Sequence, residues 1–209
     1  YGTDLVWLKR YIKEGYDYIG LGGLVGNTTN SACIKWIDSC FMYVCNNPQR
    51  IPKVKLHGFG ITSYKLIWKY PWFSVDSAGW TKSGSYGNII VPKKERGEYN
   101  YKIGPYIVKV AEELSQKEKN KEKEPKINFN MEGKKLSYNS LSPLRKQYIK
   151  EWLEYINIPL GSLNSDGKIK ELGVTTFHSF RRIACLFYYY YMQLQIPEYP
   201  RVLSVDIKE

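Results

Sequence analysis

The stretch from Tyr16 to Gly23, YDYIGLGG, sets the fold class, because it predicts a short β-strand that ends at two glycines. An amphipathic helix is predicted over residues 5–14 (LVWLKRYIKE), and Gly15 is placed to end that helix as a C-cap. A helix, a glycine turn and a strand in close succession are typical of α/β proteins.

The same order continues for another 50 residues or so. Apolar spacing and turn residues predict four further elements. They are a helix over residues 28–45, a strand over 54–56 ending at His57-Gly58, a helix over 62–68 capped by Thr62, and a strand over 72–75 ending at Asp76. Short loops between alternating strands and helices indicate parallel α/β units.

Parallel strands bring their carboxyl ends to one edge of a sheet, and in a β/α barrel that edge carries the chemistry. Small or polar residues follow each predicted strand, at Gly22-Gly23, His57-Gly58 and Asp76-Ser77. We therefore expect an α/β fold, and a β/α barrel is one architecture that fits it. Because three strands cannot close a barrel, such a barrel would need other strands, upstream of Tyr1 or in a partner.

Beyond Thr81 the sequence predicts an irregular region with β-like runs at residues 88–91 and 106–110 between glycines. Residues 112–126 contain five Lys and five Glu, which indicates a solvated helix end or a flexible insertion. The predicted segments are 1–92 (barrel strands and helices), 93–140 (basic irregular insertion with a charged linker) and 141–209 (aromatic-rich helical appendage).

Two helices are predicted near the C-terminus. The first begins at Ser142-Pro143, and the second runs from about Thr176 to Gln195. Helical spacing predicts inward positions at Leu144, Tyr148, Trp152, Tyr155 and Ile156, and at Phe177, Phe180, Ile183, Ala184, Phe187, Tyr191 and Leu194. Core packing is favoured for these aromatic residues over a stacking platform for unpaired bases.

Charge and composition indicate which partners, cellular location and cysteine chemistry fit the chain. The net charge of +11 fits a polyanion such as nucleic acid, and a basic protein without such a partner fits equally well. No apolar run approaches the roughly 20 residues of a spanning helix, and no signal peptide opens the sequence, which favours the cytoplasm. Cys33, Cys40, Cys45 and Cys185 form no metal-binding pattern, so reduced buried thiols are expected.

Three motifs are candidates for function. Residues 20–26 (GLGGLVG) follow a strand, but their spacing fits neither a dinucleotide fingerprint nor a P-loop. They form either a tight turn or an exposed backbone that a flat ligand can approach. His57 is either a structural histidine or a pocket residue. Asp76 ends an apolar strand, so it either caps the next turn or takes part in the chemistry.

These motifs resemble those of one enzyme family. Residues 18–26 (YIGLGGLVG) resemble the I-G-G-L-A-V-G segment of tRNA-guanine transglycosylases, and residues 56–62 (LHGFGIT) resemble their L-M-G-V-G-T segment. Residues 73–77 (FSVDS) stand in the place of their M-F-D-C strand end. Residues 70–77 (YPWFSVDS) are closer to the DpdA-type branch, which modifies phage and bacterial DNA. The resemblance covers about residues 5–92.

The resemblance implies that the chain is the C-terminal portion of a (β/α)8 (TIM-type) barrel, followed by the irregular β/loop region and the C-terminal helices. The enzyme would exchange guanine in DNA, or less closely in tRNA, for a 7-deazaguanine base. Asp76 would be the nucleophile that attacks the sugar C1′ and forms a covalent glycosyl-enzyme. No redox cofactor would be needed. The implied base-binding residues are Gly22, Gly23, Leu24, His57, Gly58, Gly60 and Ser77, and Trp80 and Lys82 would hold the nucleic-acid backbone.

Two features depart from the family. The C-x-C-x-x-C…H zinc site of the tRNA enzymes is not matched, so we expect no metal. The family's second catalytic aspartate lies on an earlier barrel strand that this sequence does not contain. An N-terminal barrel half or a partner subunit is therefore expected. The alternatives are a non-catalytic nucleic-acid-binding subunit that docks on a catalytic partner, and a barrel-derived structural protein.

Overall fold

The computed structural model describes residues 4–27, 29–111 and 133–204, which belong to two compact units. The first unit comprises Tyr1–Ala78 and Ile196–Glu209, and the second comprises Gly79–Gln195. The predicted charged stretch at 112–126 and the predicted helix start at Thr28 lie outside the described residues.

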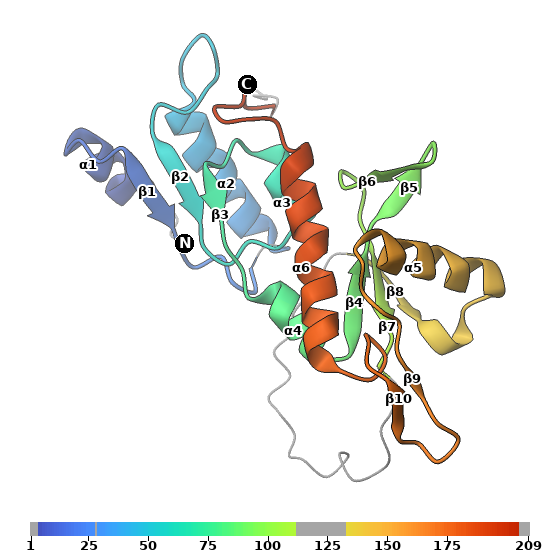
Figure 1. The fold of residues 1–209 in the computed structure, drawn as a ribbon. Coiled ribbons are helices and arrows are strands. Elements are labelled where there is room, and N and C mark those ends of the chain that lie inside the picture. The colour runs from blue at the N-terminus through green and yellow to red at the C-terminus, as the bar shows by residue number, and fades with distance from the viewer. Residues whose placement is uncertain (1–3, 28, 112–132, 205–209) are drawn as a thin grey trace. The chain divides into compact units, whose positions relative to one another are not determined.

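The first unit is built on a three-stranded parallel sheet in the order β1-β2-β3 (Figure 1). Its helices and strands alternate as the sequence predicts. In chain order they are α1 (Val6–Lys13), β1 (Tyr18–Leu21), α2 (Ser31–Val44), β2 (Lys55–Gly58), α3 (Tyr64–Lys69) and β3 (Ser74–Val75). The predicted parallel α/β architecture of this segment is confirmed.

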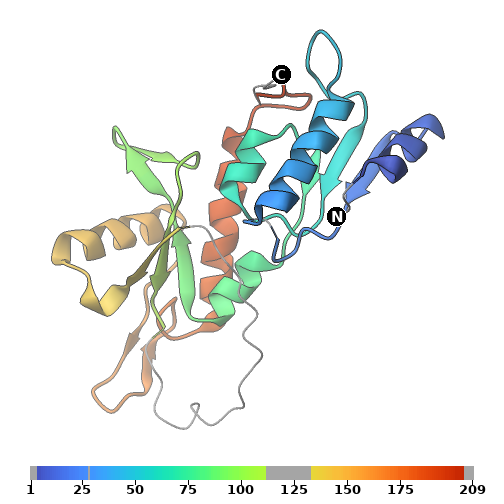
Figure 2. The same cartoon turned by 180° about the vertical axis from the view of Figure 1, so that it is seen from behind.

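Helices α2 and α3 cover one face of this sheet, as the two opposite views show (Figure 1, Figure 2). Consecutive parallel strands joined by right-handed crossovers put every connecting helix on the same side. The covered face holds the core of the unit, which includes Ile19, Leu21, Leu56, Cys33, Ile37, Phe41, Val44, Leu66 and Ile67. The strands form an open sheet, and the described residues contain no closed barrel.

Side chains and glycine fix the helix ends. Gly15 follows α1 with a φ of 91°, as expected of a C-cap. The side chain of Asn30 accepts a hydrogen bond from the amide of Ala32 at 2.9 Å and begins α2. The prediction that Thr62 caps the next helix is wrong, because the Ser63 hydroxyl accepts the bond from the Leu66 amide instead.

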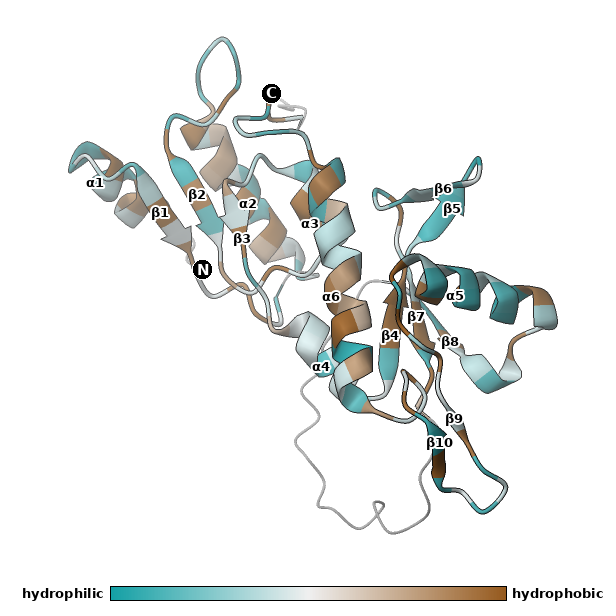
Figure 3. Ribbon diagram, in the orientation of Figure 1, coloured by the Kyte–Doolittle hydropathy of each residue, from teal (hydrophilic) through white to brown (hydrophobic). Residues whose placement is uncertain are grey.

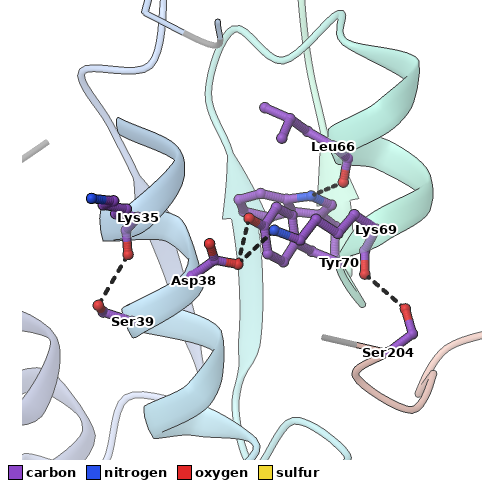
Figure 4. A network of polar contacts seen from close by, with 8 residues as sticks. Lys35, Asp38, Ser39, Leu66, Lys69, Tyr70 and Ser204 are labelled. Atoms are coloured by element: carbon purple, nitrogen blue, oxygen red, sulfur yellow. Dashed lines mark hydrogen bonds and ion pairs between the residues drawn. The ribbon is translucent and has the colours of Figure 1, made fainter. Parts of the chain in front are cut away.

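A carboxylate joins α2 to the end of α3 (Figure 4). Asp38 accepts hydrogen bonds from the Lys69 ammonium at 2.7 Å and from the Tyr70 hydroxyl at 2.9 Å. The Tyr70 side chain is fully buried and stacks on Phe41 at 5.0 Å between ring centroids. Burial raises the pKa of Tyr70, and the bond to Asp38 raises it further, so the phenol remains a hydrogen-bond donor.

The segment after residue 195 completes the first unit. The Arg201 guanidinium donates hydrogen bonds to the carbonyl groups of Ile67 and Tyr70, at the end of α3. The Leu203 amide donates to the carbonyl of Arg50 at 2.9 Å. Because the last carbonyl groups of a helix have no partner inside the helix, Arg201 satisfies groups that burial would otherwise leave unpaired. Burial lowers the pKa of Arg201.

The described residues of the second unit form a mixed sheet in the order β4-β7-β8, two hairpins and three α-helices. Figure 3 shows β4 and β7 as its hydrophobic strands. The elements are α4 (Gly79–Ser85), β4 (Asn88–Val91), β5 (Lys93–Glu95), β6 (Glu98–Asn100), β7 (Tyr106–Lys109), β8 (Lys134–Ser137), η2 (Tyr138–Ser140), α5 (Pro143–Tyr155), β9 (Ser162–Leu163), β10 (Ile169–Glu171) and α6 (His178–Gln195).

Helix α4 was not expected from the sequence, which predicts an irregular region there. Its Gly84 lies so close to α6 that an added Cβ would come within 2.6 Å of the Arg182 backbone nitrogen. The buried Arg181 guanidinium donates to the carbonyl of Gly84 at 2.9 Å. Glycine weakens an isolated helix, but here the missing side chain lets two helices approach closely.

The C-terminal helices begin where the sequence predicts, and several of their inward positions are wrong. Leu144 in α5 is 81% exposed, and Leu194 in α6 is 64% exposed. Phe177 and Ile183 are also exposed. The residues of α6 that are buried are Arg181, Ala184, Cys185, Tyr188 and Met192, because α6 packs on α4 and β4 through a different face.

The boundaries of the two compact units, after Ala78 and after Gln195, differ from the predicted segment boundaries after residues 92 and 140. Strand β4 falls in the predicted barrel segment, but it pairs antiparallel with β7 of the predicted insertion. These boundaries depend on which strands pair across the sequence. The composition of a segment does not show that pairing. The four cysteines are buried free thiols, as predicted, and burial raises the pKa of Cys40 to about 12.

In the described ranges, no helix combines the length and apolar character needed to cross a membrane.

Replacing Asp38 tests the polar contact between α2 and α3. Asp38→Ala leaves the buried Tyr70 hydroxyl without its acceptor, and we expect it to cost about 1–3 kcal/mol of unfolding free energy in denaturant titration. Adding Tyr70→Phe removes the unpaired hydroxyl and should recover part of that loss. Losses that simply add in the double variant would show that the hydrogen bond contributes nothing.

Candidate functional site

The strand register gathers the predicted site residues at one edge of the first unit's sheet. Leu21 lies opposite Gly58, and Gly58 lies opposite Val75. The residues that follow each strand therefore come together, as the sequence predicts for parallel strands. They are Gly22 and Gly23 after β1, Phe59 and Gly60 after β2, and Asp76 and Ser77 after β3.

Asp76 is an exposed carboxylate held in one orientation. Its side chain is 60% exposed, and its Oδ1 accepts a hydrogen bond from the Gly60 amide at 2.7 Å. Its own amide donates to the carbonyl of Gly58 at 3.2 Å. These two contacts tie the loop after β2 to the end of β3, so Asp76 caps a loop and also presents a carboxylate to solvent.

His57 lies beside this carboxylate. Its Nε2 is 3.8 Å from Asp76 Oδ1, and only 16% of the imidazole is exposed. The opposite ring nitrogen, Nδ1, lies 2.8 Å from the hydroxyl oxygen of Ser74. The hydrogen bond at Nδ1 orients the imidazole so that Nε2 faces Asp76, at a distance longer than a hydrogen bond.

Ser74 extends the cluster to β1. Its hydroxyl oxygen lies 2.8 Å from the Tyr18 hydroxyl oxygen and 2.8 Å from His57 Nδ1. Tyr18, His57 and Ser74 project from the face that α2 and α3 leave uncovered, because side chains alternate between the two faces of a strand. Tyr18 and Ser74 were not among the predicted site residues, although strand alternation places them on the same face as His57.

Aromatic rings border the polar cluster, which consists of Tyr18, His57, Ser74 and Asp76. The Phe59 ring contacts His57 edge to face, with 4.5 Å between centroids, and Phe73 contacts Tyr18 at 5.4 Å. Gly20 makes room for Phe59, because a Cβ at this position would lie 2.4 Å from the ring. Phe59 is 48% exposed and Phe73 is 42% exposed, so the uncovered face combines polar groups with accessible ring surface.

The glycine loop after β1 offers unused backbone donors. Within the described ranges, the amide groups of Gly22, Gly23 and Leu24 donate no hydrogen bond. Gly23 has a φ of 73°, a conformation that L side chains rarely adopt, and the Leu24 side chain is fully buried. Unpaired amides at the end of a strand are ready to bond an acceptor on a ligand.

Trp80 and Lys82, predicted to hold a nucleic-acid backbone, lie in α4 of the second unit. The geometry of the site in the first unit therefore does not include them. Across the described parts of the chain, no cluster of three or more His, Cys, Asp and Glu side chains is arranged to hold a metal ion.

No protein-family model, curated protein or solved structure matches the chain.

Removing the Ser74 hydroxyl tests how His57 is held. Because Ser74→Ala removes the partner of Nδ1, we expect the ¹⁵N resonances of the His57 imidazole to shift in NMR spectra. The other histidine, His178, should be unaffected. Ser39→Ala, which removes an exposed hydroxyl bonded within α2, is the matched control. An unchanged His57 spectrum in Ser74→Ala would refute the contact.

Proposed function

We propose that the chain is the part of a base-exchange transglycosylase that carries the nucleophile, replacing guanine in DNA by a 7-deazaguanine. The observation that carries the proposal is the position of Asp76. It is an exposed carboxylate at the end of a parallel strand, oriented by the Gly60 amide and next to His57. The unpaired amides of the loop after β1 lie at the same edge of the sheet.

The chemistry needs one carboxylate oxygen within reach of the sugar. Asp76 attacks C1′ of the target nucleotide, the bond from C1′ to the base nitrogen breaks, and guanine departs with the bonding electrons and gains a proton. The incoming 7-deazaguanine loses a proton and displaces the carboxylate from C1′. Proton gain and loss cancel over the exchange, and no oxidant or reductant takes part. The proposal accordingly includes no cofactor.

A flat base suits the surroundings of Asp76. The amides of Gly22, Gly23 and Leu24 can bond acceptors on the base edge, and the absence of side chains at the two glycines permits a close approach. His57 and the accessible Phe59 ring supply stacking or hydrogen-bonding surface. Gly58, Gly60 and Ser77 complete the edge. The target nucleotide has to leave the base stack to enter such a site.

The barrel is part of the proposal. Sequential parallel strands with all connecting helices on one face are the arrangement found in consecutive units of a (β/α)8 barrel. The uncovered face with His57, Ser74 and Tyr18 would then be the barrel interior. We propose that further strands, from a partner or from another part of the protein, complete the barrel and supply the second acid or base. Such an enzyme would act in the cytoplasm of a bacterial or phage-infected cell.

The net charge of +11 favours a nucleic-acid substrate, with Trp80 and Lys82 of the second unit as backbone contacts. The same charge also supports a second candidate function, a non-catalytic nucleic-acid-binding subunit that docks on a catalytic partner. The two candidates differ in guanine exchange, which the enzyme performs with Asp76 and the binding subunit does not perform, whereas DNA binding by the subunit needs no Asp76.

Incorporation of labelled guanine into DNA separates the two candidates. We expect the protein, supplied with its barrel partner, to incorporate the label, and Asp76→Asn to lower the rate by about 1000-fold or more, because the nucleophile is lost. Asp17→Asn is the matched control, since Asp17 is an exposed carboxylate just before β1, at the opposite edge of the same sheet.

The opposite outcome would identify the binding subunit. If wild-type protein exchanges no guanine, and salt-dependent DNA binding survives Asp76→Asn, the enzyme proposal is wrong.

A further inference from the structure

The second unit contains a groove that plays no part in the proposed function. Its volume is about 890 Å³, and its walls come from the β5–β6 hairpin, α5 and the end of α6. The lining side chains are tyrosines, glutamates and a few others, namely Lys94, Gly97, Glu98, Tyr99, Tyr101, Glu151, Glu154, Tyr155, Tyr191, Leu194 and Gln195. The groove is therefore aromatic and acidic.

Three tyrosines form a continuous aromatic wall. The ring centroids of Tyr99 and Tyr155 lie 5.2 Å apart, and those of Tyr155 and Tyr191 lie 5.1 Å apart. The fully buried Trp152 stands behind them, 5.1 Å from Tyr99. Burial raises the pKa of Tyr99, so its ring is neutral at physiological pH. The wall is held in place from behind and presents ring surface to the groove.

The net charge of the groove is negative, in a unit whose other ionised side chains are mainly basic. Glu151 is paired with the Lys94 ammonium at 2.9 Å, and this pair is neutral. Glu98 and Glu154 are exposed and form no ion pair with any residue that the structure describes. Two carboxylates therefore remain uncompensated beside the aromatic wall. They would repel a phosphate group, which argues against a nucleotide ligand.

One cation already lies against a ring of the groove. The Lys94 ammonium is 5.0 Å from the Tyr99 centroid, and it is 5.6 Å from the centroid of Tyr148, which does not line the groove. A cation within about 6 Å of a ring centroid is attracted by the electron-rich ring face. Lys94 covers one end of the wall, while Tyr155 remains 54% exposed farther along it.

We propose that this groove binds an organic cation, a quaternary ammonium or a guanidinium group, through Tyr99, Tyr155 and Tyr191 with Glu98 and Glu154. Aromatic faces suit a large, weakly hydrated cation better than a small metal ion, and nearby carboxylates neutralise its charge. At about 890 Å³ the groove also has room for the remainder of such a ligand. The site is independent of Asp76.

Titration with choline tests the proposal directly, with ¹H–¹⁵N NMR spectra of the full chain as the measurement. The amide of Gly97 is the reporter, because Gly97 lines the groove at the hairpin turn. We expect choline to shift this signal and its neutral carbon isostere, dimethylbutanol, to bind about ten-fold more weakly. Equal amounts of sodium chloride control for ionic strength, and arginine amide tests a ligand that carries a guanidinium group together with an ammonium group.

Substitutions in the groove test whether choline binds there. The double variant Glu98→Gln with Glu154→Gln should weaken choline binding about five-fold, because two exposed carboxylates lose their charge. Tyr155→Leu should weaken binding by a similar factor through loss of ring surface. Glu171→Gln, in the exposed strand β10 outside the groove, should have no effect.

Three results would overturn the proposal. The first is no shift of the Gly97 signal with either choline or arginine amide. The second is equal binding of choline and dimethylbutanol, which would show an apolar groove without selectivity for charge. The third is tighter binding of deoxyguanosine monophosphate than of choline, which would identify a stacking site for a nucleotide.

Discussion

Parallel hydrogen bonding between β1, β2 and β3 in one register is the constraint on which the candidate site depends. It places Gly20, His57 and Ser74 in one row across the sheet, and it brings the residues after each strand to one edge. A slip of one residue would turn His57 toward the helices and Leu56 toward solvent. The buried residues under α2 and α3 therefore fix the register, and the register assembles the polar cluster.

Much of the first unit could be predicted because its signals are local. Gly15 after the first helix, the helical spacing of apolar residues and the small or polar residues after each strand identify its elements from residue 5 to residue 76. The edge shared by Asp76, His57 and the glycine loop follows from parallel pairing. The hydrogen bonds that join Ser74 to Tyr18 and to His57 could not be predicted, since they depend on the order of strands and on side-chain conformation.

The second unit shows where such reasoning fails. Gly84 indicates a turn in the sequence, but in the structure it lies inside α4, where it lets α6 approach. Arg181 would be assigned to the surface by its charge, but it is buried because backbone carbonyl groups of Gly84 and Val174 accept its hydrogen bonds. Tertiary contacts decide both positions, and they also place the tyrosines and glutamates of the groove together.

The proposed reaction requires a covalent bond from Asp76 to the sugar. The protein, supplied with its barrel partner, is incubated with DNA whose guanine nucleotide carries a fluorine at C2′ to slow breakdown of the intermediate, and the masses of the denatured protein and of its peptides are then measured. We expect an added mass equal to the DNA strand without the guanine base, attached to the peptide that contains Asp76. An unmodified protein, or an adduct on a different residue, would contradict it.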